Sequence, residues 1–360
     1  MTDFIGMVVE SDYGREIKVD LKDKKILGAL AVNARLSPSE IGRIVGLSKD
    51  AVRYRIIQLE KKGIIRGSVV IANPSKVGYY LHTVLLKLEN LSEERENELI
   101  KFFAAFPLGI WFGKCSGRWD FVFEVIAKDM KQFDKIMQKI KSVCGKNLRD
   151  YESLTAFNLV KYVDLPDDFY KDLGLKFEFE RKSVAFAKEI KKGIIEFDYE
   201  KQIKLDLTDA RILKALSENA CAQISEIANR TRIPRDTVVN RIRSMVNNGL
   251  IIAFNPIINL TYLKYHLYVV FFHLANLTDE KEKEFFNYMS VHSFVAYGAK
   301  LMGKYEAQIF LIVKDPMHMH EIMMEFRRKF SGIIEDYEPL LVIKDYKYNF
   351  LPEGVFPKII

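Results

Sequence analysis

The sequence predicts an α+β protein in which one structural unit occurs twice in tandem. Three observations lead to this prediction: a repeat at a constant offset, helical spacing of apolar residues at the start of each copy, and alternating strand-like and helical segments in the remainder. With 360 residues, 49% of them hydrophobic, the chain is long and apolar enough to bury several cores.

The repeat has an offset of 186 residues and runs through each copy without a gap. The pattern Asp-Leu-x-Asp begins at Asp20 and again at Asp206. Chance does not produce so many identities at one spacing, and the repeat is too long for a solenoid, so each copy contains whole domains. Further matched pairs are Gly63 with Gly249, Gly117 with Gly303, Tyr162 with Tyr348, and Pro166 with Pro352.

The first part of each copy is predicted to contain three short helices. In the first copy, apolar residues at helical spacing follow Asp20 and, after a polar break, Ser39. A tight turn then precedes Ser48, which is a suitable N-cap for a third helix, and Gly63 ends that helix. Residues 64–73 have the composition of a β-ribbon. Together these features predict a winged helix-turn-helix domain, whose third helix enters the DNA major groove.

The third helix, residues 48–62, carries five basic and two acidic side chains. Arginine can bind guanine through two hydrogen bonds, whereas lysine and serine suit phosphate groups. Arg55 recurs in the second copy, so it either braces the helix or contacts a phosphate. The residues expected to read bases, in the N-terminal half of the helix, are Lys49, Asp50, Arg53 and Tyr54. Ser48 and Arg55 complete the predicted DNA-binding set of this copy.

The second copy has a different recognition helix. Pro234 takes the place of the Ser48 cap, and Val239 takes the place of Arg53. If both helices contact DNA, they are therefore expected to read different half-sites. A winged helix that binds another protein, and an ordinary solvated helix face, are the alternatives. The DNA-binding residues predicted in this copy are Arg235, Asp236, Thr237, Asn240, Arg241 and Arg243.

The rest of each copy has the order β-α-β-β-α-β, which is typical of a ferredoxin-like fold. In the first copy the predicted elements lie at residues 80–88, 93–106, 109–126 (two strands), 129–143 and 151–162. One face of such a sheet is covered by its own helices, and the other needs a partner. We expect the two sheets to pair face to face, through apolar residues such as Val84, Leu86, Phe121 and Phe123.

These elements predict five segments. A connector between the copies contains Val184, Ala187 and Ile190 at helical spacing, so it is expected to include an amphipathic helix at 181–192. The expected segments are a winged helix-turn-helix at 1–75, a ferredoxin-like regulatory domain at 76–166, a linker at 167–192, a second winged helix-turn-helix at 193–261, and a second ferredoxin-like regulatory domain at 262–360.

Several short patterns together resemble the Lrp/AsnC family of leucine-responsive, or feast/famine, regulators. They are Leu21-x-Asp23-x-x-Ile26-Leu27, Ser39-Glu40-Ile41, Leu47-Ser48-x-x-x-Val52-x-x-Arg55, Leu59-Glu60-x-x-Gly63-Ile64-Ile65, and the turn Gly117-Arg118-Trp119-Asp120-Phe121. The resemblance covers both copies. It implies a transcription regulator that binds double-stranded DNA and forms a homo-oligomer, such as a dimer, through its regulatory domains.

The resemblance also implies control by an amino acid or another small effector. In this family the effector site lies between regulatory domains, near the glycine turn. It carries over here to Gly117, Asp120, Gly303 and Glu306, and the change from Asp120 to Glu306 weakens the match in the second copy. Family members usually have one unit per chain, so the family's usual oligomer sizes do not transfer to this tandem form.

An enzyme of the same fold is the alternative. Some relatives of this fold are siroheme decarboxylases, which bind a tetrapyrrole and use a histidine on a strand near the glycine turn. Residues 111–119 contain no histidine, and the second copy has Tyr297, Lys300 and Lys304 there, also without histidine. We therefore expect a regulator with no enzymatic activity and no cofactor.

Other chemistries have little support in the sequence. Cys115, Cys144 and Cys221 form no C-x-x-C pair, and residues two apart on a helix, as in His318 and His320, point in different directions, so no metal site is expected. The N-terminus lacks the basic start of a signal peptide, and no apolar run is long enough to cross a membrane. We expect a cytoplasmic protein without a membrane partner. The net charge of +7 is compatible with a polyanionic partner.

Overall fold

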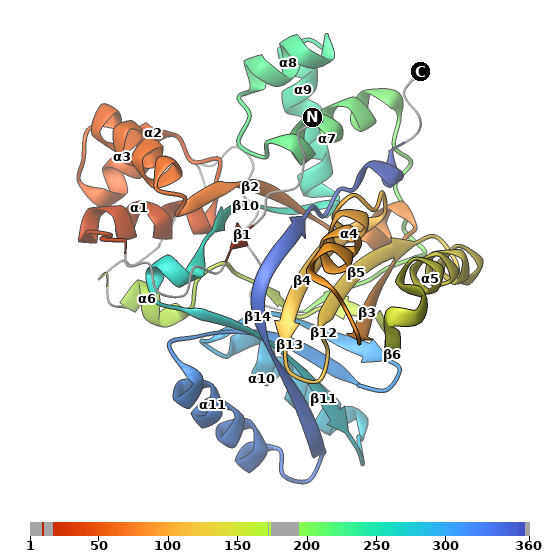
Figure 1. Cartoon of the computed structure of the whole chain (residues 1–360). Coiled ribbons are helices and arrows are strands. Elements are labelled where there is room, and N and C mark those ends of the chain that lie inside the picture. Colours follow the sequence, from red (N-terminus) through yellow and green to blue (C-terminus); the bar gives the residue numbers. More distant parts are fainter. Residues whose placement is uncertain (1–8, 11–16, 172, 174–193, 357–360) are drawn as a thin grey trace.

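The computed structural model describes residues 9–10, 17–171, 173 and 194–356 (Figure 1). Each copy begins with the three helices that the sequence predicts. They are α1 (Leu21–Val32), α2 (Pro38–Val45) and α3 (Lys49–Lys61) in the first copy, and α7 (Leu207–Glu218), α8 (Ile224–Thr231) and α9 (Arg235–Asn247) in the second. Asp20 and Asp206 cap α1 and α7 through capping boxes, and the Ser48 side chain accepts from the backbone N–H of Ala51 at the start of α3.

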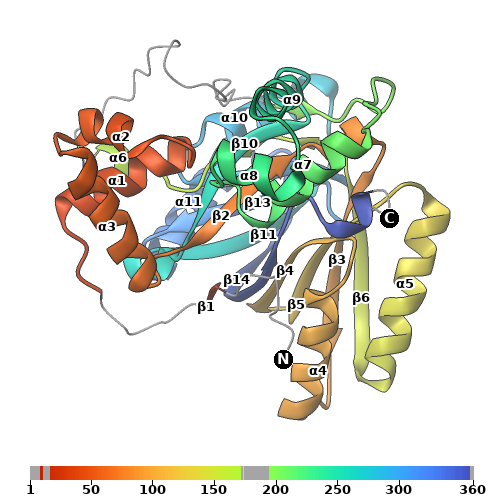
Figure 2. The ribbon, with the colours of Figure 1, turned by 90° about the horizontal axis from the view of Figure 1, so that it is seen from above.

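The ribbon that follows each helix module differs from the prediction. Each copy contributes a single strand, β2 (Ile65–Ala72) or β10 (Ile251–Ile258), and these two strands pair antiparallel with each other. The predicted ribbon at 64–73 is therefore shared between the copies instead of being a hairpin within one copy. Because a lone strand leaves its backbone groups unpaired, the second copy supplies the partner. Both helix modules lie on the same side of the molecule, next to this ribbon (Figures 1 and 2).

The regulatory parts confirm the predicted order β-α-β-β-α-β. In the first copy the elements are β3 (Tyr80–Leu88), α4 (Glu93–Ala104), β4 (Gly109–Ser116), β5 (Phe121–Ala127), α5 (Met130–Cys144) and β6 (Leu148–Ala156). In the second they are β11 (His266–Leu274), α10 (Asp279–Val291), β12 (Val295–Met302), β13 (Ala307–Val313), α11 (Pro316–Lys329) and β14 (Ile334–Tyr348). The strand predicted at 151–162 is interrupted: β7 (Asn158–Leu159) and β8 (Lys161–Tyr162) follow β6 as separate pieces.

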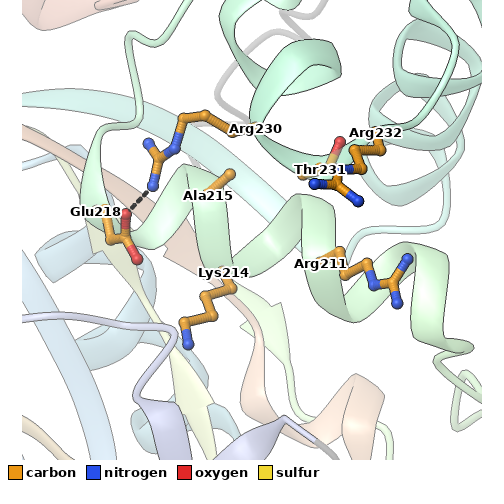
Figure 3. Close-up of a pocket in the computed structure, with 7 residues that line it drawn as sticks. All are labelled: Arg211, Lys214, Ala215, Glu218, Arg230, Thr231 and Arg232. Carbon is orange, nitrogen blue, oxygen red and sulfur yellow. Dashed lines mark hydrogen bonds and ion pairs between the residues drawn. The ribbon is translucent and has the colours of Figure 1, made fainter. Parts of the chain in front are cut away.

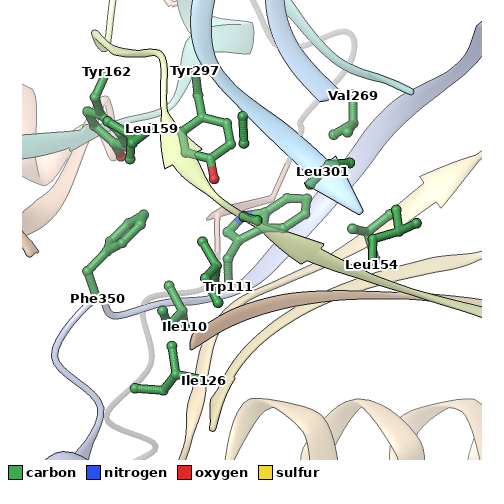
Figure 4. Packing of buried hydrophobic residues seen from close by; sticks show 14 of the residues in the cluster. Ile110, Trp111, Ile126, Leu154, Leu159, Tyr162, Val269, Tyr297, Leu301 and Phe350 are labelled. Atoms are coloured by element: carbon green, nitrogen blue, oxygen red, sulfur yellow. The ribbon is translucent and has the colours of Figure 1, made fainter. Parts of the chain in front are cut away.

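The two sheets join edge to edge and close into a barrel. The strand order is β14-β11-β13-β12-β6-β3-β5-β4, and β4 pairs back onto β14. Closure pairs the edge strands of both sheets, which explains why the copies associate within one chain. The interior is filled by a large apolar cluster that includes Trp111, Leu154, Val269 and Leu301 (Figure 4).

The side chains expected at the junction of the two sheets lie elsewhere. Val84, Leu86, Phe121 and Phe123 pack under the copy's own helices α4 and α5, against Phe103 and Ile140. The alternate residues of the same strands, Leu85 and Val122, face the barrel interior instead. The prediction of which face meets the other copy was wrong because β3 and β5 are apolar on both faces. Such strands show no alternation from which the inner face could be chosen.

Short elements complete the fold. The connector starts with α6 (Asp167–Lys171), and Leu165, Phe169 and Leu173 bury their side chains against the first helix module. The amphipathic helix predicted at 181–192 lies outside the described residues. The remaining elements are β1 (Val9–Glu10), which pairs with β14, β9 (Ile195–Glu196), which pairs with β7, and the 3₁₀ turns Pro74–Val77, Gly145–Asn147, Leu260–Leu263 and Glu353–Val355. None of the described helices is long and apolar enough to cross a membrane.

Candidate nucleic-acid interface

Helix α3 presents a compact group of polar and aromatic side chains to solvent. Lys49, Asp50, Arg53 and Tyr54 are all exposed, and the Tyr54 ring is 64% exposed. The opposite face of the helix is buried through Val52 and Leu59. The fold therefore brings four of the residues predicted to read bases onto one free surface. Ser48, the N-cap, lies at the same end of the helix.

Arg55 lies apart from this group and binds the first helix. Its guanidinium is 2.7 Å from a carboxylate oxygen of Asp20 and 2.7 Å from one of Asp23. The hydrogen bonds that Arg55 donates to Asp20 and Asp23 raise its pKa above the usual value. Of the two roles that the sequence allowed for Arg55, the structure shows the brace between α3 and the start of α1.

The second copy repeats the brace. Arg241 lies 2.8 Å from a carboxylate oxygen of Asp206 and 3.2 Å from one of Asp209. The attraction of Asp209 is the main cause that raises the pKa of Arg241. The sequence allowed a bracing role for the repeated arginine but did not identify its partners, although two aspartates three residues apart and a distant arginine recur together at the same offset.

Helix α9 offers a different surface from α3. Arg235, Asp236, Asn240 and Arg243 are exposed, and Thr237 is half-buried. The Arg243 guanidinium lies 3.4 Å from the side-chain oxygen of Asn240, so these two residues form one polar group on the helix. Because Val239 stands at the position that corresponds to Arg53, α9 lacks the charge that Arg53 supplies on α3.

A basic hollow distinguishes the second helix module from the first (Figure 3). It has a volume of about 380 Å³, and Arg230 forms an ion pair with Glu218 at its edge. Its other charged lining residues are Arg211, Lys214 and Arg232. In the first copy the corresponding positions hold Lys25, Gly28, Val32, Ile44 and Gly46. The two modules have therefore diverged behind their recognition helices as well as on them.

Comparison with known proteins agrees with this geometry. The winged helix-turn-helix DNA-binding family matches residues 19–66 and 205–252, which are the two helix modules. The DNA-binding transcriptional activator DecR of Escherichia coli strain K12 is 30% identical over 146 residues, which is 40% of this chain and 95% of DecR. The HTH-type transcriptional regulator LrpA of Pyrococcus abyssi is 48% identical over 66 residues, or 18% of this chain and 47% of LrpA.

The chain belongs to the Lrp/AsnC family of transcription regulators. A further relative, the proline dehydrogenase transcriptional activator of Rhodobacter capsulatus, is 32% identical over 122 residues, covering 33% of this chain and 78% of that protein. Each of these matches spans less than half of the chain, in keeping with a family unit that is present twice here.

The whole chain also shares its fold with an enzyme. The crystal structure of the siroheme decarboxylase NirDL in co-complex with an iron-uroporphyrin III analogue has a TM-score of 0.55 to this protein, with 14% identity. The similarity covers 93% of this chain and 96% of that one. At this identity the likeness shows the fold alone. The arrangement of almost the whole chain therefore recurs in another protein.

The glycine turns, where the Lrp/AsnC resemblance places an effector, contact the other copy. Gly117 has a φ of +146°, and a Cβ there would lie 2.7 Å from Leu340 and 3.0 Å from the carbonyl oxygen of Pro339. Gly303 has a φ of +143° and the same relation to Ser153 and Leu154. Each turn therefore requires glycine for two reasons: the backbone has a positive φ, and the two copies approach closely there.

The acidic residues of the two turns fasten them to the neighbouring strand. Asp120 accepts a hydrogen bond from the backbone N–H of Leu88 at 2.7 Å and pairs with Lys87 at 3.0 Å. Glu306 accepts from the N–H of Leu274 at 2.7 Å. His273 lies 3.1 Å from Glu306, so a histidine does stand beside the second turn, on β11. Nothing in the sequence indicates this contact, because His273 lies on β11 whereas the turn follows β12.

Proposed function

We propose that this Lrp/AsnC protein binds DNA through two unlike recognition helices, α3 and α9, which enter successive major grooves of one site. The observation that carries the proposal is a contrast between the two copies. The outward-facing residues of the recognition helices differ, whereas the contacts that hold these helices in place are the same. Arg53 and Tyr54 of α3 correspond to Val239 and Asn240 of α9, whereas the arginine brace is the same in both copies. Such a protein reads an asymmetric site, with half-sites about 34 Å apart or a multiple of that distance.

The residue types assign different contacts to the two helices. Arg53 suits guanine in the major groove, and Asn240 suits adenine through two hydrogen bonds. Ser48, and Arg235 and Arg243 on the other helix, suit phosphates. Lys49 lies with Arg53 among the side chains proposed to read bases. Asp50, Tyr54, Asp236 and Thr237 complete the proposed contact surfaces. Arg55 and Arg241 act through the brace, by holding each recognition helix at a fixed angle to the rest of its module.

We further propose that the regulatory domains assemble with a second chain and respond to an amino acid or another small effector near the glycine turns. Both turns are exposed at Gly117 and Gly303, and the neighbouring Met302 side chain is 58% exposed. The turns are therefore accessible to a second chain as well as to a ligand. A small change at Gly117 or Gly303 would also be transmitted to the opposite copy, which each turn contacts directly.

The proposed function is regulatory and not enzymatic, and it places the protein in the cytoplasm with its DNA. The shared fold with siroheme decarboxylase makes tetrapyrrole chemistry the second candidate. The two are separated by a direct assay: CO₂ release from siroheme by the purified chain, or a coloured purified protein, would favour the enzyme.

DNA binding is tested by selecting bound sequences from a random duplex library and measuring affinity for the selected site by fluorescence anisotropy. Arg53→Ala is expected to weaken binding through one half-site, and Asn240→Ala through the other, each by about 1–3 kcal/mol. Lys135→Ala, on the exposed face of α5, removes a charge outside both helix modules and serves as the control. Binding should fall steeply as salt rises, because counterions are released from the duplex. No binding at low salt would contradict the proposal.

A further inference from the structure

A small cavity lies at the junction of β8, β10, β12 and β14, between the barrel and the shared ribbon. Its volume is about 70 Å³, which is enough for a molecule of a few non-hydrogen atoms, since one water in the liquid occupies about 30 Å³. The polar and aromatic residues that line it are Tyr162, Asp164, Tyr297, Phe310, Asp345 and Tyr348. The cavity is separate from the recognition helices and from both glycine turns.

The cavity exists on one side of the repeat because the two copies differ there. At the equivalent positions, 186 residues away, Asp164 corresponds to Phe350 and Asp345 to Leu159. Likewise, Ala296 of the cavity wall corresponds to the larger Ile110. Leu159, Phe350 and Ile110 are all buried in the apolar core, where Figure 4 shows them packed together with Trp111. One of two equivalent places is thus filled, and the other is open and acidic.

The carboxyl groups of the cavity are not fully satisfied by the protein. The Oδ2 atom of Asp164 is buried and has no hydrogen-bond partner among the described residues, and neither polar side-chain atom of the wholly buried Asn255 has one. Burial raises the pKa of Asp164 to about 8; the neighbouring Asn255 amide opposes this rise, although its geometry falls short of a hydrogen bond. Burial also raises the pKa of Asp345 to about 7, although Trp111 donates a hydrogen bond to it at 2.8 Å. Unmet acceptors in a cavity favour a ligand that donates hydrogen bonds.

The lining chemistry selects the class of ligand. Carboxyl groups together with aromatic rings are the surroundings that protein sites use for organic ammonium ions, through charge-assisted hydrogen bonds and cation–π attraction. A bound cation favours the ionised carboxyl, so its binding releases the proton that burial otherwise retains on these aspartates. A divalent metal ion is not matched, because the described residues contain no group of three or more His, Cys, Asp or Glu side chains placed to hold one. An amino acid is not matched either, because its carboxylate would bring further acceptors to a cavity that already holds an unmet acceptor on Asp164.

We propose that this cavity binds a small primary ammonium ion of about three non-hydrogen atoms. The ammonium group donates hydrogen bonds to Asp164 and Asp345, and the hydrocarbon part lies among the rings of Tyr297, Phe310 and Tyr348. Strand β10 forms part of the wall through Pro256, Ile257 and Ile258. The ligand therefore contacts the ribbon that joins the two helix modules.

The test is calorimetry and thermal unfolding of the full chain with ethylammonium chloride. Ethanol, which has the same number of non-hydrogen atoms and no charge, alanine, and sodium chloride at equal ionic strength are the comparisons. Ethylammonium is expected to give saturable binding with a Kd in the millimolar range, as befits so small a ligand, and to raise Tm above the sodium chloride value. No saturable heat and no Tm shift beyond that of sodium chloride would overturn the proposal, as would alanine binding as tightly as ethylammonium.

Variants locate the binding. Asp164→Phe copies the residue at the equivalent position and fills the cavity, and Asp345→Asn removes a charge with almost no change of shape. Each is expected to weaken ethylammonium binding at least tenfold, whereas Asp134→Asn, on the exposed face of α5, leaves it unchanged. If Asp164→Phe does not fold, Asp345→Asn alone shows whether ethylammonium binds in this cavity. Binding that is unchanged in Asp345→Asn would exclude this cavity as the site.

Discussion

The hydroxyl oxygens of Tyr162 and Tyr348 lie 2.8 Å apart, and the two residues occupy equivalent positions of the two copies. The hydrogen bond therefore crosses the junction of the copies, between two tyrosines that the repeat relates to each other. Burial raises the pKa of both hydroxyls, so both remain neutral and one donates to the other. The junction is held by this polar contact as well as by the apolar interior of the barrel.

Removing both of these hydroxyls is expected to cost less stability than the sum of the losses from removing each one alone. Tyr162→Phe and Tyr348→Phe each leave a buried hydroxyl without this partner, at a cost of about 1–2 kcal/mol. The double variant leaves none, so its loss should be smaller than the sum by about 1 kcal/mol. Denaturant unfolding of the four proteins measures this. Strictly additive losses would show that the bond contributes nothing, and the exposed Tyr54→Phe is the control.

The close approach at the glycine turns gives a second prediction. Gly117→Ala forces a Cβ to 2.7 Å from Leu340 and 3.0 Å from a carbonyl oxygen, at a φ that alanine rarely adopts. The expected loss of stability is about 1–3 kcal/mol, and Gly303→Ala should behave alike because its contacts repeat those of Gly117. Gly332→Ala is the matched control, since a Cβ there meets no heavy atom within 4 Å. Equal stability of the Gly117→Ala and Gly332→Ala proteins would contradict the prediction.

Local features of the fold could be predicted from the sequence because local chemistry determines them. The Ser48 cap was expected from its place before an apolar helix face, and it does accept from Ala51 at the start of α3. Likewise, the order β-α-β-β-α-β follows from the spacing of apolar residues and turns. The repeat allowed the order of the elements to be inferred in two places, which is why the architecture of both copies could be predicted.

Contacts between the copies could not be predicted in the same way. The pairing of β2 with β10 depends on which strand lies nearby in space, and the sequence of a strand does not specify its neighbour. The role of Arg55 was left between two possibilities, because only the folded chain shows that Asp20 and Asp23 lie beside it. The acidic cavity was missed altogether, since Asp164 and Asp345 are far apart in the sequence and resemble ordinary surface residues there.

Two neighbouring arginines of α3 should differ in what their loss does. Arg53→Ala, at an exposed position, is expected to change the free energy of unfolding by less than about 0.5 kcal/mol and to weaken DNA binding. Arg55→Ala should lower stability by about 1–2 kcal/mol, because it leaves Asp23, only 11% exposed, without its charged partner. Arg241→Ala should resemble Arg55→Ala. Unfolding curves and anisotropy titrations measured on the same preparations separate the two effects, and a destabilised Arg53→Ala protein would contradict this assignment.

The buried carboxyl of Glu124 gives a prediction about pH. Burial raises its pKa to about 7, although the Gln308 side chain donates to it at 3.2 Å. Between about pH 4.5 and 7 the folded protein keeps this proton while the unfolded chain has lost it, so the contribution of Glu124 to stability falls as pH rises through that window and is constant above it. At about 1.4 kcal/mol per pKa unit, the fall amounts to about 3 kcal/mol.

Glu124→Gln removes this titration and keeps an acceptor for Gln308. The variant is therefore expected to gain stability relative to the original protein as pH rises from 5 to 8, and to show no such gain at pH 4. Comparing the two proteins at each pH isolates Glu124 from the other buried groups that titrate, among them His82, whose pKa burial lowers to about 4. Glu321→Gln, on the exposed face of α11, is the control and should leave the pH profile unchanged. If the difference between Glu124→Gln and the original protein did not vary with pH, Glu124 would have to be ionised in the folded barrel, which requires a cation or water beside it.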